Sequence, residues 1–153
     1  MRTARVAGKM LYLDTSAFLK LYVAEEGSVT VQKALNQSDE PLPLSELLEM
    51  EFTNALQLKV FWGDLDSQQA AAQMDHFDRR KKRGLYYYPE VHRSELMAQF
   101  REFSKATPDL ACRTMDILHL AYARLFEADC FVTFDQRQRT LAQQVGFNLL
   151  ETD

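Results

Sequence analysis

The chain has 153 residues, of which 46% are apolar and 26% are charged. This balance is typical of a folded domain and excludes a disordered or fibrous chain. The 22 acidic and 18 basic side chains give a formal charge of −4, which excludes the strongly basic proteins that bind nucleic acids indiscriminately. We therefore expect one domain over residues 1–153, with residues 1–9 as a loose N-terminal extension.

The sequence predicts a cytoplasmic protein that does not enter a membrane. Asp14 interrupts the short apolar run 10–13 after the basic N-terminus, so this region does not have the pattern of a signal peptide. No stretch approaches the roughly 18 uncharged apolar residues of a membrane span. Cys112 and Cys130 have no metal-type spacing and do not indicate a disulfide scaffold, which fits a reducing compartment.

Short apolar runs alternate with longer helical patterns along the chain. Runs of strand type occur at 10–13, 42–44, 85–88, 130–133 and 147–150. The clearest helical patterns cover 46–60 after Ser45, about 67–83 after Asp66 or Ser67, and about 108–127 after Thr107. Four glycines are expected just after helix ends, namely Gly27, Gly63, Gly84 and Gly146. The alternation predicts an α/β three-layer sandwich, in which helices flank a mostly parallel central sheet of about five strands.

Acidic residues follow two of the predicted strands. Asp14 comes directly after the first strand, and Asp135 follows the run that ends at Thr133. Ligands of open α/β sheets bind beyond the carboxyl ends of the strands. Each aspartate taken alone is equally well explained as the N-cap of the next helix, but the pair favours a binding site.

The predicted helix 46–60 carries three acids that do not share one face. Glu51 lies about 200° around the helix from Glu49, close to Leu47 and Leu58, and is expected to be buried. Glu46 and Glu49 are expected to face solvent. A buried carboxylate is costly unless a metal or a cation compensates it, and the alternative is a salt bridge at the edge of the core.

Asp116 interrupts another apolar helical segment, 115–126, so a second acid is expected where water is scarce. His119 follows three residues later, and an Asp-x-x-His ligand pair is conceivable. We interpret His119 instead as a core histidine bonded to a backbone carbonyl, and we do not count it as a ligand.

Four segments, taken in order, resemble the PIN-domain ribonucleases, and specifically the VapC toxins of prokaryotic type II toxin–antitoxin pairs. They are LYLDTSA at 11–17, EFTNAL at 51–56, DILHLAYA at 116–123 and FVTFD at 131–135. The resemblance implies that Asp14, Glu51, Asp116 and Asp135 are catalytic and line a pocket that holds Mg²⁺ or Mn²⁺. We expect Asp14 and Asp116 to be direct ligands, with Glu51 and Asp135 bound directly or through water. Oxygen ligands of this kind are those that hard divalent cations prefer.

The activity implied by the resemblance is endonucleolytic hydrolysis of RNA by an activated water, leaving a 5′-phosphate and a 3′-hydroxyl. The implied partners are an RNA substrate, a cognate antitoxin protein and a second copy of the chain in a homodimer. An alternative is a catalytically silent PIN-like module that binds RNA or a protein. The presence of all four acids favours the enzyme, whereas the acidic balance of the chain departs from what tight binding of free RNA requires.

Two further groups of polar residues are candidates for supporting roles. Thr15, Ser16 and Thr133 are expected to hydrogen-bond a carboxylate or a phosphate, with helix capping or strand preference as alternatives. A basic run is expected to contact RNA phosphates, or simply to complement the dipole of a helix that ends before Gly84. Its members are Arg79, Arg80, Lys81, Lys82 and Arg83.

Overall fold

The computed structural model describes residues 9–152, and most of the expected N-terminal extension, residues 1–8, lies outside this range. Its strands are β1 (Leu11–Leu13), β2 (Leu42–Pro43), β3 (Tyr86–Tyr87) and β4 (Cys130–Val132). Its α-helices are α1 (Thr15–Leu19), α2 (Ser28–Asn36), α3 (Glu46–Phe61), α4 (Ser67–Lys82), α5 (Arg93–Phe103), α6 (Thr107–Leu110), α7 (Thr114–Leu125) and α8 (Gln136–Gln144). A short 3₁₀ helix, Ser104–Ala106, connects α5 to α6.

The strands form two parallel pairs at the centre of the molecule. β1 pairs with β4, with Leu13 opposite Val132, and β2 pairs with β3. The predicted fifth strand is reduced to one parallel bridge between Phe131 and Leu149. Pro43 has no N–H to donate, so β2 cannot offer hydrogen bonds along its whole length. The predicted α/β class with parallel strands is confirmed, whereas one continuous five-stranded sheet is not seen among the described residues.

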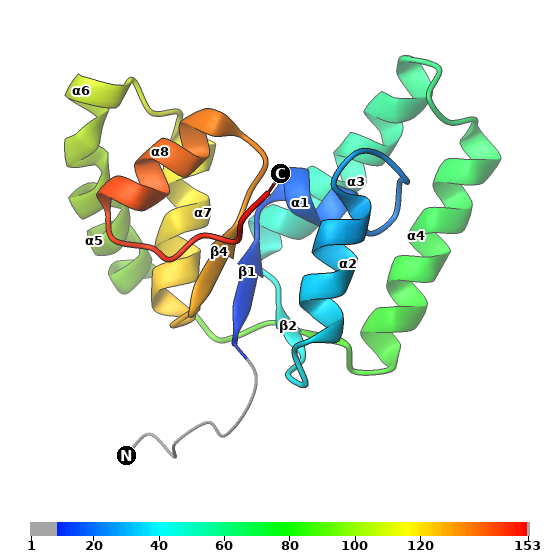
Figure 1. Ribbon diagram of the computed structural model, residues 1–153, viewed down its shortest axis with the longest axis horizontal. Helices are drawn as coiled ribbons and strands as arrows, with labels where there is room; N and C mark the ends of the chain where they lie inside the picture. Colours follow the sequence, from blue (N-terminus) through cyan, green and yellow to red (C-terminus); the bar gives the residue numbers. More distant parts are fainter. Residues whose placement is uncertain (1–8, 153) are drawn as a thin grey trace.

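The β1–β4 pair separates two hydrophobic cores (Figure 1). Leu11 and Leu13 of β1 point into one core with α1, α2, α3 and α4. Tyr12 and Phe131 point to the other face and pack with α5, α7 and α8. This alternation is the period of two that a strand imposes on its side chains. Helices therefore cover both faces of the central strands.

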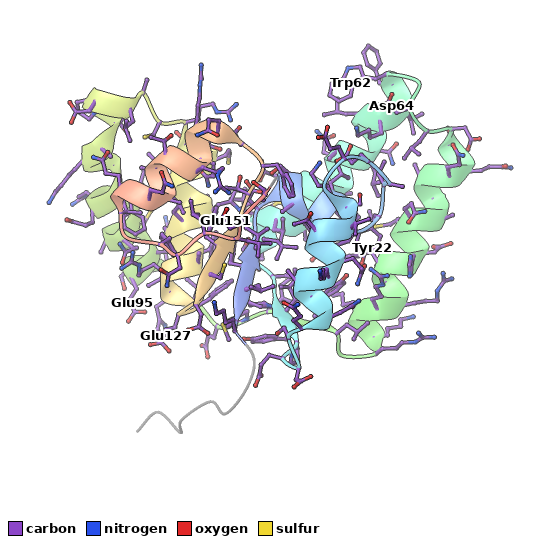
Figure 2. The ribbon with its side chains drawn as sticks, viewed as in Figure 1. Tyr22, Trp62, Asp64, Glu95, Glu127 and Glu151 are labelled. Atoms are coloured by element: carbon purple, nitrogen blue, oxygen red, sulfur yellow. The ribbon has the colours of Figure 1, made fainter. Side chains whose placement is uncertain are left out.

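The two long helices of the first core begin where the sequence predicts. The Ser45 side chain accepts the N–H of Leu48 at the start of α3, and Asp66 forms a reciprocal capping box with Gln69 at the start of α4. The two helices pack as a hairpin whose tip exposes Phe61 and Trp62, as the position of Trp62 in Figure 2 shows.

The predicted helix 108–127 is wrong in one respect, because the chain breaks it into α6 and α7. Ala111 adopts the left-handed conformation with φ of 50° and ends α6 after one turn. Arg113 is extended and begins α7 without a side-chain cap. The break places Arg113 and Asp116 at the N-terminal end of α7. Among the described helices, none combines the length and hydrophobicity of a membrane-spanning segment.

Gly27 precedes a helix and does not follow one, contrary to the prediction. It is the N-cap of α2 with φ of 91°, a conformation that favours glycine. A Cβ atom at this position would lie 2.5 Å from Cε1 of Phe134, the residue before Asp135. Gly63, Gly84 and Gly146 follow helix ends as predicted, also with positive φ.

We predict that Gly27→Ala lowers the free energy of unfolding more than Gly63→Ala does. Both positions share the cost of a left-handed residue, about 1–2 kcal/mol. The added Cβ at Gly27 meets the Phe134 ring, whereas nothing lies within 4 Å at Gly63. The clash should add roughly 1–3 kcal/mol to the loss, measured by urea unfolding. Equal losses in the two variants would show that the contact with Phe134 is not restrictive.

Candidate functional site

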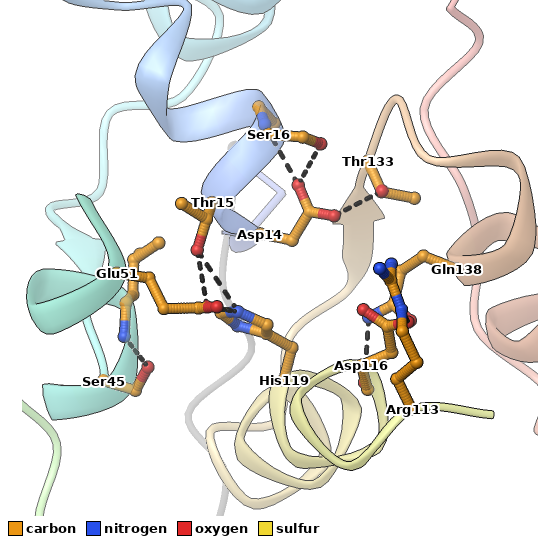
Figure 3. A network of polar contacts seen from close by, with 12 residues as sticks. Asp14, Thr15, Ser16, Ser45, Glu51, Arg113, Asp116, His119, Thr133 and Gln138 are labelled. Atoms are coloured by element: carbon orange, nitrogen blue, oxygen red, sulfur yellow. Dashed lines mark hydrogen bonds and ion pairs between the residues drawn. The ribbon is translucent and has the colours of Figure 1, made fainter. Parts of the chain in front are cut away.

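The site lies where β1 and β4 end and the helices after them begin (Figure 3). The backbone N–H of Asp14 donates to the carbonyl of Val132 at 3.1 Å, so the chain just after β1 lies beside the end of β4. Asp14 caps α1 through Ala17, and Asp135 caps α8 through Arg137 and Gln138. Both aspartates therefore act as N-caps at the same edge of the strand pair.

Asp14 is the most enclosed of the four acids, with 5% of its surface exposed. Its Oδ1 accepts hydrogen bonds from the Ser16 hydroxyl at 2.6 Å and from the Ala17 N–H at 3.0 Å. Its Oδ2 accepts the hydroxyl of Thr133. Burial raises the pKa of Asp14, and the hydrogen bonds from Ser16 and Thr133 oppose that shift only in part. The ionised carboxylate is thus held in a fixed position at an energetic cost.

Glu51 reaches the site from α3 and contacts His119 of α7. His119 Nε2 lies 2.5 Å from Glu51 Oε1, and the Thr15 hydroxyl donates to the same oxygen at 2.8 Å. Partial burial opposes ionisation of Glu51, but the hydrogen bonds from His119 and Thr15 outweigh it and lower the pKa of the carboxyl. The interpretation of His119 as bonded to a backbone carbonyl is wrong. It is buried, as expected, but its hydrogen bonds are to side chains.

A chain of buried hydrogen bonds supports His119 from behind. His119 Nδ1 lies 2.8 Å from the Tyr12 hydroxyl, which lies 3.1 Å from the Ser45 hydroxyl. Burial raises the pKa of Tyr12, so its hydroxyl stays protonated and donates a hydrogen bond to Nδ1 of His119. His119 Nε2 then donates to Glu51 Oε1. Every bond of this chain is satisfied in one direction, from Ser45 to Glu51.

Asp116 and Asp135 share one guanidinium. Arg113 Nε donates to Asp116 Oδ2 at 3.0 Å, and an Nη atom of Arg113 donates to Asp135 Oδ2, also at 3.0 Å. Gln138, which is fully buried, donates to the backbone carbonyl of Asp116 at 2.9 Å and so ties α8 to the first turn of α7. The sequence did not single out Arg113 or Gln138. The spacing of three residues between Arg113 and Asp116 is the signal that could have indicated the first pair.

The donor set fits a hard divalent cation in its chemistry. Four carboxylates are joined through their neighbours. Thr15 binds Glu51 and adjoins Asp14, and Thr133 binds Asp14 and accepts the N–H of Asp135. Arg113 joins Asp135 to Asp116. Oxygen ligands of this kind suit Mg²⁺ or Mn²⁺. Within residues 9–152, however, no three acidic, histidine or cysteine side chains converge closely enough to share a metal ion. Instead, His119 hydrogen-bonds Glu51, and Arg113 pairs with Asp116 and Asp135.

The basic run lies on the other side of α3 from Glu51. Lys81 pairs with Glu49 at 3.3 Å, and the Tyr88 hydroxyl donates to the same carboxylate. The guanidinium of Arg80 lies 5.1 Å from the centre of the Tyr22 ring. Glu49 is therefore half-buried and paired, contrary to expectation, and Glu51, expected to be buried, has the same side-chain exposure of 32%. Glu46 is exposed as predicted. Within residues 9–152, neither Arg80 nor Lys81 forms an ion pair with any of the four acids of the site.

We predict that Asp14→Asn raises the melting temperature at pH 7 without divalent cations by roughly 2–4 °C, or about 1 kcal/mol in a chain of this size. Asparagine keeps the cap but removes a buried charge. Because the pKa of Asp14 is raised in the folded state, its ionised form costs stability above that pKa, and the cost disappears as the carboxyl is protonated. The advantage of the variant should therefore shrink as the pH falls.

Scanning calorimetry in chelator between pH 7 and pH 4 tests this, with Glu46→Gln as a matched change at an exposed carboxylate. A lower melting temperature of Asp14→Asn at pH 7 would mean that the buried charge is fully compensated by its hydrogen bonds.

We also predict that Tyr12→Phe and Glu51→Gln are coupled, because both act through the His119 ring. A double-mutant cycle by urea unfolding should give an interaction energy of about 0.5–3 kcal/mol. The control cycle pairs Glu51→Gln with Tyr122→Phe, a hydroxyl on α7 outside this chain of hydrogen bonds, and should be additive. Additive losses in the Tyr12 cycle would exclude the continuous chain.

Comparison with known proteins assigns the chain to one family. No curated protein matches the chain at a significant level. The model of the PIN domain family matches residues 11–144, a span that contains Asp14, Glu51, Asp116 and Asp135. PIN domains are generally nucleases, and these usually use divalent metals. The match covers most of the chain, which therefore belongs to the PIN domain family.

Proposed function

We propose that this PIN domain is an endoribonuclease that depends on Mg²⁺ or Mn²⁺. The observation that carries the proposal is the placement of four carboxylates from separate elements around the ends of β1 and β4. A purely structural role would not require a buried carboxylate as costly as that of Asp14. Carboxyl groups whose pKa is shifted by burial in this way are typical of functional sites.

Asp14 and Asp116 would hold the cation directly, with Glu51 and Asp135 bound directly or through water. When bound, the cation would stabilise negative charge on the scissile phosphate and favour the ionised form of the attacking water. The hydrogen bonds from Ser16, Ala17 and Thr133 fix the position of Asp14 without neutralising its charge.

Glu51 is suited to accept a proton from the attacking water. Its Oε1 is occupied by His119 and Thr15. Its other oxygen, Oε2, forms no hydrogen bond within residues 9–152, and its side chain is 32% exposed. His119 keeps the carboxylate ionised and oriented, which leaves Oε2 as the atom that would take the proton, and the lowered pKa makes Glu51 a weaker base than an ordinary glutamate.

The biological setting that we propose is that of a cytoplasmic toxin, which pairs with a cognate antitoxin and forms a homodimer. This part rests on the resemblance of the four acidic segments to those of VapC toxins. We further propose that the two parallel strand pairs and the bridged segment at Leu149 belong to one five-stranded central sheet. The single bridge between Phe131 and Leu149 supports this arrangement.

A silent PIN module that binds RNA or a protein is the second candidate. The observation in its favour is that Arg113 already neutralises part of the charge of Asp116 and Asp135, and His119 hydrogen-bonds Glu51, without any metal. Retention of all four acids favours the enzyme over this candidate.

We predict that the purified chain cleaves RNA in Mn²⁺ and that chelator abolishes the cleavage. Asp116→Asn should reduce the rate at least 100-fold, because it weakens the proposed hold on the cation and phosphate. Glu46→Gln is the matched control, since Glu46 is exposed on α3, and it should cleave at the rate of the unchanged chain. Product ends should be 5′-phosphate and 3′-hydroxyl, as read by end-labelling.

Several RNA pools and a single-stranded DNA are assayed in parallel. Cleavage that persists in chelator, or that Asp116→Asn does not reduce, would contradict the assignment of the site. Binding of RNA without cleavage by either form would favour the silent module.

A further inference from the structure

Arg113 stands apart from the other groups that surround the four acids. Within residues 9–152 it is the only lysine or arginine that pairs with any of them. Asp14 is held by hydroxyls and a backbone N–H, and Glu51 by His119 and Thr15. Asp116 and Asp135 instead depend on a full positive charge carried by one side chain.

The position of the guanidinium is that of a bridging cation. Asp116 comes from the first turn of α7 and Asp135 from the segment after β4, yet both present Oδ2 to Arg113 at 3.0 Å. The other oxygen of Asp135 is already taken by the N–H groups of Arg137 and Gln138. The oxygen of Asp135 that binds Arg113 is therefore the one available to an added ion.

The Arg113 side chain is also exposed and takes no part in a helix cap. Its side chain is 59% exposed, and its backbone begins α7 without a hydrogen bond from the side chain to the helix. Within the described chain, the side-chain hydrogen bonds of Arg113 are those to the two aspartates. Displacing it would break no helix cap, but it would leave Asp116, whose side chain is 18% exposed, without a cation unless another cation takes its place.

We infer that Arg113 is a resident counter-ion that competes with the divalent cation for Asp116 and Asp135. The inference rests on the proposed function of the site. Two cations cannot both occupy the space between the same two oxygens, since like charges repel and the carboxylates would have to divide between them. Arg113 therefore lowers the affinity of the site for the metal and holds the two aspartates together when no metal is bound.

The test measures Mn²⁺ binding to the full chain by electron paramagnetic resonance, after chelation and without RNA. We expect Arg113→Gln to lower the dissociation constant for Mn²⁺ about threefold to tenfold, the effect of losing one or two partly exposed ion pairs. Arg113→Lys keeps the charge but cannot bridge as a planar fork, and it should give an intermediate constant.

Arg137→Gln is the matched control. Arg137 lies two residues after Asp135 in the first turn of α8, is exposed, and forms no side-chain ion pair within residues 9–152. It removes the same charge from the same neighbourhood and should change the constant by less than twofold. If Arg137→Gln lowers the dissociation constant as much as Arg113→Gln does, the effect comes from the overall charge of the protein and the inference is overturned.

The outcomes separate this inference from the proposed function. If the unchanged chain binds Mn²⁺ and Arg113→Gln binds it no more tightly, the competition is excluded while the nuclease proposal stands. If Mn²⁺ binds only after Arg113→Gln, the competition is supported in its strongest form. Failure of all variants, with far-ultraviolet circular dichroism showing that they are folded, would overturn both.

Discussion

Burial of carboxylates at one end of the β1–β4 pair is the constraint that the surrounding structure satisfies. The strands bring Asp14 and Asp135 to the same edge, and α3 and α7 add Glu51 and Asp116. A carboxylate in a poorly solvated region is costly to ionise unless hydrogen bonds or a cation compensate it. Each acid in this site has a partner, and the partners are of different kinds.

The compensation of Glu51 extends into the core and links the site to the fold. Tyr12 points away from the first core, stacks on Phe131 at 5.6 Å, and presents its hydroxyl to His119. Ser45 joins the same chain of hydrogen bonds while it caps α3, the helix that carries Glu51. The orientation of one carboxylate is thus set by a strand, a helix cap and a buried ring together. Networks of this type give a single geometry only when every member is satisfied.

The sequence was informative where a local rule determines position. Asp14 and Asp135 could be placed because they follow apolar runs that read as parallel strands, and Glu51 because helical periodicity put it opposite Glu49. His119 was correctly placed in the interior, but periodicity does not identify the partner of a buried side chain. The break at Ala111 requires a left-handed alanine, which no local preference predicts. The predicted helix 108–127 therefore contains Arg113, whereas in the structure Arg113 begins α7.

Two members of the basic run make packing and pairing contacts, and contact of the run with RNA stays a prediction. Arg80 covers the Tyr22 ring and Lys81 pairs with Glu49, so these two side chains complete the packing of α4 against its neighbours. The arginine that contacts the site is a single residue outside any charged run.

The two halves of the site differ in how firmly their charges are compensated. Neutral donors hold Asp14, and a buried histidine holds Glu51, so both carboxylates keep fixed positions whatever occupies the site. Asp116 and Asp135 are held by an exposed guanidinium, which can be exchanged. Surface ion pairs contribute little stability, so their exchange costs little. Asp14 and Glu51 set the geometry of the site, and Asp116 and Asp135 can exchange Arg113 for another cation. Such a site is stable without a bound metal and remains able to accept one.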